Sequence, residues 1–328
     1  MGGLREPEAD PEGERTLLPA GDRAERGRVL NALDPPEGRV HAVLDTDTYN
    51  EIDDQFALVY ALMSPERIEL EAIHAAPFQN PRSEGPGDGM EKSHAEILRV
   101  LDRLGMSAEG RAFRGSDRFL SGGGPVESPA ARDLIERARR RPPGEPLYVL
   151  AIGAITNVAS ALLLDPTILD RIVVVWLCGQ PLDWPTAVEF NLCQDVTASR
   201  VVFDSGVPLV HIPCKNVAEH LRTTVPELER YVRGRGAVGD YLFEIFRDYA
   251  KDPHAWSKPL WDLSAVAWVI QPEWVPTKPV RSPRLTADHT WSLDPDRHWI
   301  RTATHVNRDA VFGDLFLKLG NAARSTGD

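Results

Sequence analysis

Apolar residues in this chain fall into short runs that alternate with stretches of helical periodicity. A run of four to eight apolar residues is typical of a buried strand, whereas apolar positions three or four residues apart indicate one face of a helix. The run at 147–152 is nearly continuous, as expected of a parallel strand that is buried on both faces. Strands are predicted at 39–45, 68–75, 147–152, 171–176 and 207–212, and helices after Asp54, at 90–104, within 226–250 and at 308–319.

The order of these elements predicts the fold class. A strand, a helix and a second strand follow one another between 39 and 75, which is a βαβ unit and therefore a parallel pair of strands. The alternation continues along the chain, and 328 residues are enough to bury one large core. We predict an α/β protein with a single domain at 27–328, in which a mostly parallel central sheet is flanked by helices.

Three segments depart from this pattern. Residues 1–26 mix acidic residues, Arg, Gly and Pro with little apolar periodicity, and such a composition predicts a flexible tail because it cannot offset the entropy of ordering. The Gly-rich stretch at 115–128 lacks the Lys-Ser/Thr of a phosphate loop and predicts a mobile lid. Residues 291–306 alternate like a β-hairpin, and nothing in them suggests chemistry.

Charge and cysteine content narrow the class of function. The formal net charge is -12, so the phosphate backbone of a nucleic-acid polymer would be repelled. Cys178, Cys193 and Cys214 include no Cys-x-x-Cys pair, which argues against a zinc ribbon or a disulfide framework and suits a reducing cytoplasm. No apolar run reaches the length of a membrane span, and the N-terminus lacks the pattern of a signal peptide. We expect a cytoplasmic protein without a nucleic-acid or membrane partner.

The densest group of acidic residues follows the first predicted strand. Asp45, Asp47, Asp53 and Asp54 all lie within the segment 43–54. Like charges this close are unfavourable unless a cation neutralises them, and carboxylate oxygens are ligands of hard metal ions. Asp47 and Asp54 are the strongest candidates for direct ligands, and the start of the following helix favours negative charge. An acidic N-cap on a buried βα unit is the alternative interpretation.

Two known families resemble this segment. The apolar strand followed by Asp-Thr-Asp-Thr resembles the haloacid-dehalogenase phosphatases, and would make Asp45 the nucleophile and Asp47 the general acid. The Asp-Asp pair at 53–54, with an Ala three residues further on, is similar to the signature Asp-Thr-Asp-Pro-Gly-x-Asp-Asp-x-x-Ala of the nucleoside hydrolases. In this chain the Pro-Gly-x spacer is replaced by Thr-Tyr-Asn-Glu-Ile at 48–52, which is two residues longer.

Three later segments occur in the order that the nucleoside hydrolases have them. Residues 153–159 resemble the family's Gly-Pro-Leu-Thr-Asn-x-Ala, residues 189–191 match its Glu-Phe-Asn, and residues 261–262 match its late Trp-Asp. The phosphatases instead carry a later Lys and a downstream Gly-Asp-x-x-x-Asp motif, and the Gly-Asp-Gly at Gly87 comes too early for that motif. From about 39 to 319, the chain therefore resembles the inosine-uridine preferring nucleoside hydrolases, in a variant with a divergent spacer.

The resemblance implies hydrolysis of the N-glycosidic bond of ribonucleosides to free base and ribose, within a doubly wound fold. It implies a Ca²⁺ held by Asp47, Asp54, Asp262 and the main-chain carbonyl of Ile152, with Asp47 as the general base that takes a proton from water. Asp45, inside the strand, is expected behind the ligands. The phosphatase remains the alternative enzyme, and a protein that binds ribonucleosides without turnover is the alternative outside the enzymes.

Contacts to the nucleoside are predicted as well. The resemblance implies that Asp53, Glu189 and Asn191 bind the ribose hydroxyls. Asn80 is a candidate contact because it lies in a loop at the end of a parallel strand, although an Asn before a Pro also caps turns. Trp261 resembles the purine-preferring branch, in which an aromatic ring stacks on the departing base, although a Trp at the start of an apolar helix also packs in cores. The resemblance further implies nucleoside salvage and a homo-oligomer, either a dimer or a tetramer.

Overall fold

The computed structural model describes residues 32–120 and 124–325, and its main feature is an eight-stranded sheet. In spatial order the strands are β3 (Ala112–Arg114), β2 (Ile68–Ala75), β1 (Val40–Thr46), β4 (Leu147–Ala151), β5 (Ile172–Leu177), β6 (Leu209–Ile212), β12 (Trp299–Ala303) and β9 (Thr277–Arg281). Each strand runs parallel to its neighbour except β9, which is antiparallel to β12. The prediction of a mostly parallel central sheet is therefore confirmed.

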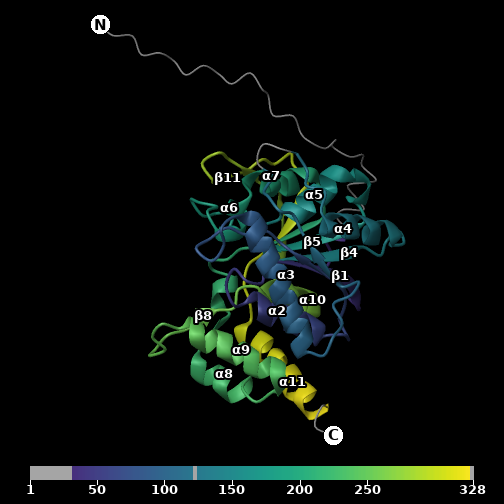
Figure 1. Cartoon of the computed structure of the whole chain (residues 1–328). Helices are drawn as coiled ribbons and strands as arrows, with labels where there is room; N and C mark the ends of the chain where they lie inside the picture. The colour runs from purple at the N-terminus through teal and green to yellow at the C-terminus, as the bar shows by residue number, and fades with distance from the viewer. Residues whose placement is uncertain (1–31, 121–123, 326–328) are drawn as a thin grey trace.

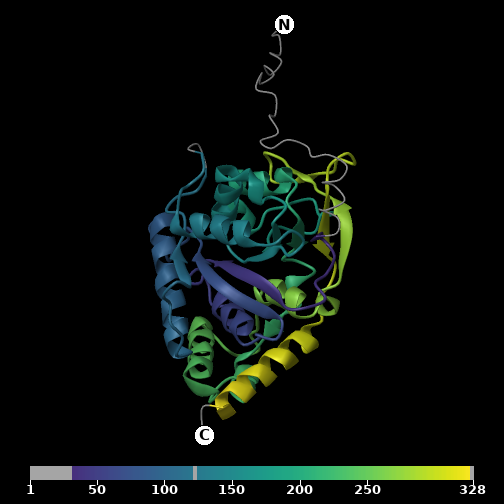
Figure 2. The same cartoon turned by 90° about the vertical axis from the view of Figure 1, so that its right-hand side faces the viewer.

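Helices cover both faces of this sheet, as Figures 1 and 2 show. One face carries α4 (Pro129–Arg140), α5 (Thr156–Leu164), α6 (Phe190–Gln194) and α7 (Val196–Ser205). The other face carries α2 (Asp54–Leu62), α3 (Pro86–Arg103), α8 (Val225–Tyr231), α9 (Gly236–Tyr249), α10 (Leu263–Ile270) and α11 (Arg308–Ser325). The chain thus forms one doubly wound α/β domain, as predicted.

The central strands are apolar throughout because both of their faces are buried. Every residue of β4 and β5 is buried. Successive side chains of a strand point to opposite faces of the sheet, so alternate residues enter two different apolar clusters. Val149 of β4 and Val174 of β5 pack under α5, whereas Leu150 and Val175 pack on the side of α2 and α10. This double burial accounts for the continuous apolar runs in the sequence.

The strand order creates a topological switch point, termed the crevice, at the carboxyl end of β1. This strand pairs with β2 on one side and with β4 on the other. The chain therefore leaves β1 in one direction and resumes at β4 in the other, and the loops after these two strands diverge. Ligands of open α/β sheets bind at such a switch point. Residues 47–53, with their aspartates, follow β1, and residues 152–155 follow β4.

Most predicted elements are confirmed, but two predictions differ from the structure. The helix predicted at 90–104 begins four residues earlier, at Pro86, because Pro is favoured in the first turn of a helix. The prediction of a hairpin at 291–306 is wrong. Strand β11 (Trp291–Ser292) pairs with β10 (Arg284–Leu285) in a separate small sheet, whereas β12 joins the main sheet. Alternation indicates a strand but carries no information about its partner, which for β11 is the strand before it and for β12 are β6 and β9.

Some elements were not predicted at all. Strand β9 contains Lys278 and Pro279 and lies at an edge of the sheet, where polar residues and Pro are tolerated and the apolar pattern is weak. A separate two-stranded sheet pairs β7 (Arg222–Thr223) with β8 (Lys258–Pro259). The second of these strands ends three residues before Asp262, so it holds the late Trp-Asp motif near the crevice.

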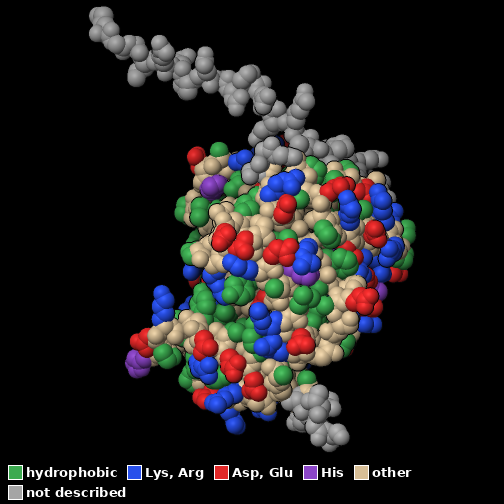
Figure 3. Space-filling model, in the orientation of Figure 1, with side chains coloured by type: hydrophobic (Ala, Val, Ile, Leu, Met, Phe, Trp, Pro, Cys, Tyr) green, Lys and Arg blue, Asp and Glu red, His purple; other side chains and the backbone are tan. Residues whose placement is uncertain are grey.

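The described residues leave parts of the prediction untested. The tail predicted at 1–26 and residues 121–123 of the predicted lid lie outside them. Across 32–120 and 124–325, none of the helices combines the length and the apolar character that a membrane crossing requires. Figure 3 shows acidic and basic side chains interspersed over the face in view, and the described residues of that face form no continuous basic band.

Candidate active site at the carboxyl edge of the sheet

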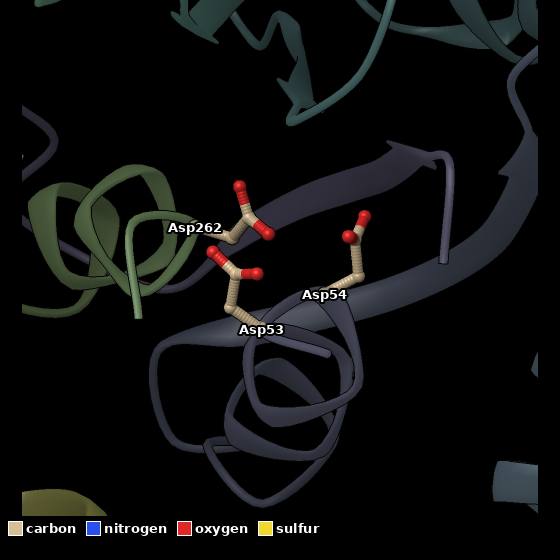
Figure 4. A group of neighbouring side chains, drawn as sticks. All are labelled: Asp53, Asp54 and Asp262. Atoms are coloured by element: carbon tan, nitrogen blue, oxygen red, sulfur yellow. The ribbon is translucent and has the colours of Figure 1, made fainter. Parts of the chain in front are cut away.

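Three aspartates from two distant segments converge at the end of β1. Asp53 and Asp54 begin α2, and Asp262 begins α10. Each contributes a carboxylate oxygen that lies within 4.8 Å of the other two, and all three residues are buried (Figure 4). Asp53 and Asp262 occupy N-cap positions, yet neither side chain caps its helix. The carboxylates therefore point into a shared space, which disfavours the interpretation of simple N-caps.

Asp47 lies beside this group and is the least satisfied side chain of the site. It is 1% exposed, and no N–H or hydroxyl group of the described residues donates a hydrogen bond to either of its oxygens, although the Asp54 carboxyl group is close enough to share a proton with it. Burial first, and then the charge of Asp54, raises the pKa of Asp47 well above its usual range. A buried polar group without a partner is unfavourable unless a ligand completes it. The two free oxygens of Asp47 thus fit a bound cation or a water molecule.

The remaining carboxylates of the cluster have raised pKa values for the same reason. Burial, and after it the charge of Asp53, raises the pKa of Asp54 to about 7, although the Thr46 hydroxyl donates a hydrogen bond of 2.5 Å to this carboxylate. Burial and the charges of Asp53 and Asp54 raise the pKa of Asp262 well above its usual range. Four buried acids that each disfavour ionisation make a site where a divalent cation would be strongly stabilised.

Asp45 lies behind the cluster in β1. Asn157, at the start of α5, donates a hydrogen bond of 2.7 Å from Nδ2 to Asp45 Oδ1. The Asn157 oxygen accepts bonds from the main chain and hydroxyl of Ser116, at 2.8 and 2.9 Å. Burial raises the pKa of Asp45 to about 6. The Thr-Asn segment after β4 therefore orients an aspartate and a loop, which is a supporting position.

Lys258 is the residue of the site that sequence reasoning missed. Its side chain is 6% exposed, and its Nζ lies 3.2 Å from Asp53 Oδ1 and 2.5 Å from Glu51 Oε2. The second oxygen of Asp53 accepts a hydrogen bond of 3.0 Å from the main-chain nitrogen of Trp261. Burial opposes the charged ammonium, but Asp53 and Glu51 outweigh it and raise the pKa of Lys258. The sequence offered one signal for this role, which is a lysine directly before the Pro-Leu-Trp-Asp motif in a chain whose segment 45–54 is rich in acidic residues.

The loops after β4 and β5 bring two further predicted residues together. Asn191 Nδ2 donates hydrogen bonds to the main-chain oxygens of Ile152, at 3.2 Å, and Leu177, at 3.0 Å. A Cβ atom at Gly153 would lie 3.0 Å from the carboxylate carbon of Asp47, so the absence of a side chain lets this loop approach Asp47 closely. Ile152, Asn191 and Asp47 are thus placed around one corner of the crevice.

Other predicted residues are engaged elsewhere. Glu189 begins α6, and its carboxylate accepts hydrogen bonds from the main-chain nitrogens of Gly179, Asn191 and Leu192, at 2.8, 3.0 and 3.1 Å. Asn80 donates a hydrogen bond of 2.7 Å to the Asn50 side chain, in the spacer. Within the part of the chain that the structure describes, neither side chain is hydrogen-bonded to the four aspartates.

The model of the inosine-uridine preferring nucleoside hydrolase family matches residues 42–313. This chain belongs to that family. Relatives include the pyrimidine-specific ribonucleoside hydrolases RihA of Citrobacter koseri, 29% identical over 252 residues, and Salmonella typhimurium, 29% identical over 256; each match covers 67% of this chain and 77% of the relative. The purine-preferring ribonucleoside hydrolase from Gardnerella vaginalis has the same fold, with a TM-score of 0.70 and 22% identity over 87% of this chain and 99% of that one.

Family membership confirms the resemblance and assigns this nucleoside hydrolase to the enzymes that act on N-glycosidic bonds. It also decides between the two families that the aspartate loop resembles, because the match extends over the whole domain and not only over the first strand and loop. The family is metal-dependent, and the acidic cluster that this requires is present in the chain.

Proposed function

We propose that this nucleoside hydrolase converts ribonucleosides to free base and ribose with Ca²⁺ as its cation, and that Asp47 is the general base. The observation that carries the proposal is the Asp47 carboxylate, which is buried beside three other aspartates and has two unpartnered oxygens. Such a group is unfavourable in the metal-free chain, and both a cation and a reacting water would complete it.

The donor set fits a hard divalent ion. Asp47, Asp54, Asp262 and the Ile152 carbonyl would hold it, and all four supply oxygen, which suits Ca²⁺ and disfavours zinc. When bound, the cation supplies positive charge that polarises water and the vicinal hydroxyls of the sugar. Asp53 lies in the same group of carboxylates, so it adds another oxygen atom beside the proposed cation site.

Different side chains of the site carry out proton transfer and sugar binding. Asp47 takes the proton of the attacking water, because its buried carboxylate lies at the site and receives no hydrogen bond from an N–H or hydroxyl group of the described residues. The water oxygen forms a bond to C1′ of the ribose while the bond from C1′ to the base nitrogen breaks, and the electron pair of that bond leaves with the base. Asp53 and Asn191 bind the sugar hydroxyls. The main-chain nitrogen of Trp261 orients Asp53, and the main-chain oxygen of Ile152 orients Asn191.

Support for the individual sugar contacts differs. Asp53 belongs to the converging group, so a hydroxyl at the crevice would reach it. Glu189 supports the proposal less directly, because its carboxylate already accepts three main-chain hydrogen bonds. Asn80 reaches the crevice through Asn50 of the spacer, and we propose that it contacts substrate from there.

The test is a panel of purine and pyrimidine ribonucleosides assayed for released ribose, with the protein supplied with Ca²⁺ or with chelator. We expect release that depends on the cation. Nucleoside that binds and is recovered unchanged after long incubation would instead identify a binding protein without turnover. Phosphate release from a phosphate ester would favour the phosphatase chemistry.

We also propose a cytoplasmic setting and a homo-oligomeric state. The free thiols of Cys178, Cys193 and Cys214 support a reducing compartment, and the oligomer rests on the family resemblance. Size-exclusion chromatography with light scattering tests the second of these.

A further inference from the structure

The longer spacer of this chain is anchored from several elements. Asn80 donates a hydrogen bond to the Asn50 side chain, and Arg82 Nη1 donates one of 3.2 Å to the main-chain oxygen of Glu51. The hydroxyl of Tyr249, at the end of α9, donates a hydrogen bond of 3.1 Å to Glu51 Oε1. These contacts keep the Glu51 carboxylate close to the crevice, although it is 38% exposed.

Lys258 joins this spacer to the aspartate cluster. Its Nζ has three acceptors, which are Glu51 Oε2, Asp53 Oδ1 and the main-chain oxygen of Pro259 at 3.3 Å. An ammonium group has three hydrogens, so all of its donors are used. Asp53 in turn is held at both oxygens by the segment that carries Lys258 and Trp261. The cluster therefore contains one fixed, buried positive charge.

We propose that Lys258 is a positioning residue that orients Asp53 and limits how tightly the aspartate cluster binds a divalent cation, and that Glu51 of the longer spacer moderates this by sharing the ammonium group. The inference rests on the proposed cation site. It deepens that proposal, because it assigns a purpose to the two extra residues of the spacer and to a lysine for which the four-oxygen donor set has no use.

The two partners of this ion pair should change cation affinity in opposite directions. Loss of the Lys258 charge leaves Asp53 without its nearest counter-ion and increases the negative potential at the cluster, so a cation binds more tightly. Loss of the Glu51 charge leaves the lysine to Asp53 alone and reduces the negative potential, so a cation binds less tightly. A pair that only stabilised the fold would lower the melting temperature in both variants and leave the affinity unchanged.

The experiment is calorimetric titration of the chelator-stripped full chain with Ca²⁺, at constant ionic strength and slightly alkaline pH. Lys258→Met should lower the Kd for Ca²⁺ by about tenfold, and Glu51→Gln should raise it by about threefold. Lys258→Arg keeps the charge and should restore the Kd to within about twofold of the unaltered chain. Lys318→Met is the matched control, because Lys318 on α11 is also a mostly buried lysine, and its acidic partners are Glu66 and Asp314, which do not belong to the aspartate cluster of the site.

The outcomes separate this inference from the proposed function. A Kd for Ca²⁺ that is unchanged or higher in Lys258→Met would overturn the inference while leaving the cation site intact. If Lys258→Met fails to fold, the Glu51→Gln variant decides, since unchanged or tighter binding contradicts the shared ammonium group. An unaltered chain that binds no Ca²⁺ would overturn the proposed site and this inference together. None of these measurements depends on turnover of a nucleoside.

Discussion

The two halves of the crevice satisfy their polar groups in different ways. On the side of β5, Glu189 accepts three main-chain hydrogen bonds and Asn191 donates two, so these side chains hold loops in place whether or not a nucleoside is bound. On the side of β1, Asp47 has no partner for either oxygen. Satisfied polar groups stabilise the fold, whereas buried unsatisfied ones mark the place where a ligand is required. Each half should therefore respond differently to substitution.

The largest effect is expected from Asp47→Ala. It removes the general base and a cation ligand together, so ribose release should fall by at least about a hundredfold. The same substitution removes a buried carboxylate without partners, so in chelator the melting temperature should be equal to that of the unaltered chain or higher. The measurements are steady-state ribose release and thermal unfolding. Retention of most activity would assign the base to another residue.

The opposite response is expected from Glu189→Ala. Three main-chain donors lose their acceptor, so the free energy of unfolding should fall by about 2 kcal/mol, with or without Ca²⁺. Denaturant titration measures this. Glu189→Gln, which keeps an acceptor oxygen, should recover part of the loss. Unchanged stability together with a raised KM would show that Glu189 acts mainly on the sugar, and would remove the contrast between the two halves.

A third prediction sharpens the contrast through pH. The pKa of Asp54 is raised from 3.8 to about 7, so between these values the folded chain binds more protons than the unfolded one, and stability falls as pH rises. The stabilisation by a protonated Asp54 is therefore lost as pH rises through about 7. In chelator, the unaltered chain should lose roughly 1 kcal/mol for each pH unit relative to Asp54→Asn across this window.

The comparison with Asp54→Asn is needed because other buried groups titrate nearby. Burial lowers the pKa of His211 to about 4, so this group makes stability fall as pH decreases, which is the opposite sign. Both proteins share His211, so their difference removes its contribution and leaves that of Asp54 together with the carboxylates whose pKa it raises. Melting curves over a pH series measure it. Parallel curves would mean that Asp54 is ionised in the folded chain without a cation.

How much of the site was predictable depends on the kind of signal. Asp53, Asp54 and Asp262 were found because carboxylates at helix starts within motifs are visible in the sequence, and the structure brings them together. The three main-chain bonds of Glu189 were not predictable, because they depend on where α6 starts relative to the loop after β5. Lys258 was missed since its partner Glu51 lies 207 residues away in the chain.

The same distinction between local signals and distant partners applies to the fold. Runs such as β4 and β5 are buried on both faces, so composition alone identifies them as strands. The strands at 284–303 depend on partners, and alternation does not state whether β11 pairs with β10 before it or with β12 after it. Local pattern therefore predicted elements, whereas pairing and side-chain partners required the structure.

The smallest effect is expected at Trp261, which lies beside the aspartate cluster. Its main-chain nitrogen holds Asp53, and its ring is partly buried, packs against the core and lies 5.5 Å from Lys215 Nζ. A ring that stacks on the departing base contributes about 1 kcal/mol beyond its burial. Trp261→Ala should therefore slow hydrolysis of purine nucleosides by about fivefold, a loss of that size.

A nitrophenyl riboside separates this contribution from folding. Its leaving group is already activated and departs without help, so Trp261→Ala should leave its turnover nearly unchanged. The main-chain hydrogen bond to Asp53 survives in the variant, which means that sugar binding, measured by KM, should also persist. Equal losses on both substrates, together with a lower melting temperature, would instead show that the ring only packs against the core. In that case the departing base must be activated by another group of the crevice, and the partly buried surface of Trp261 would carry no base preference.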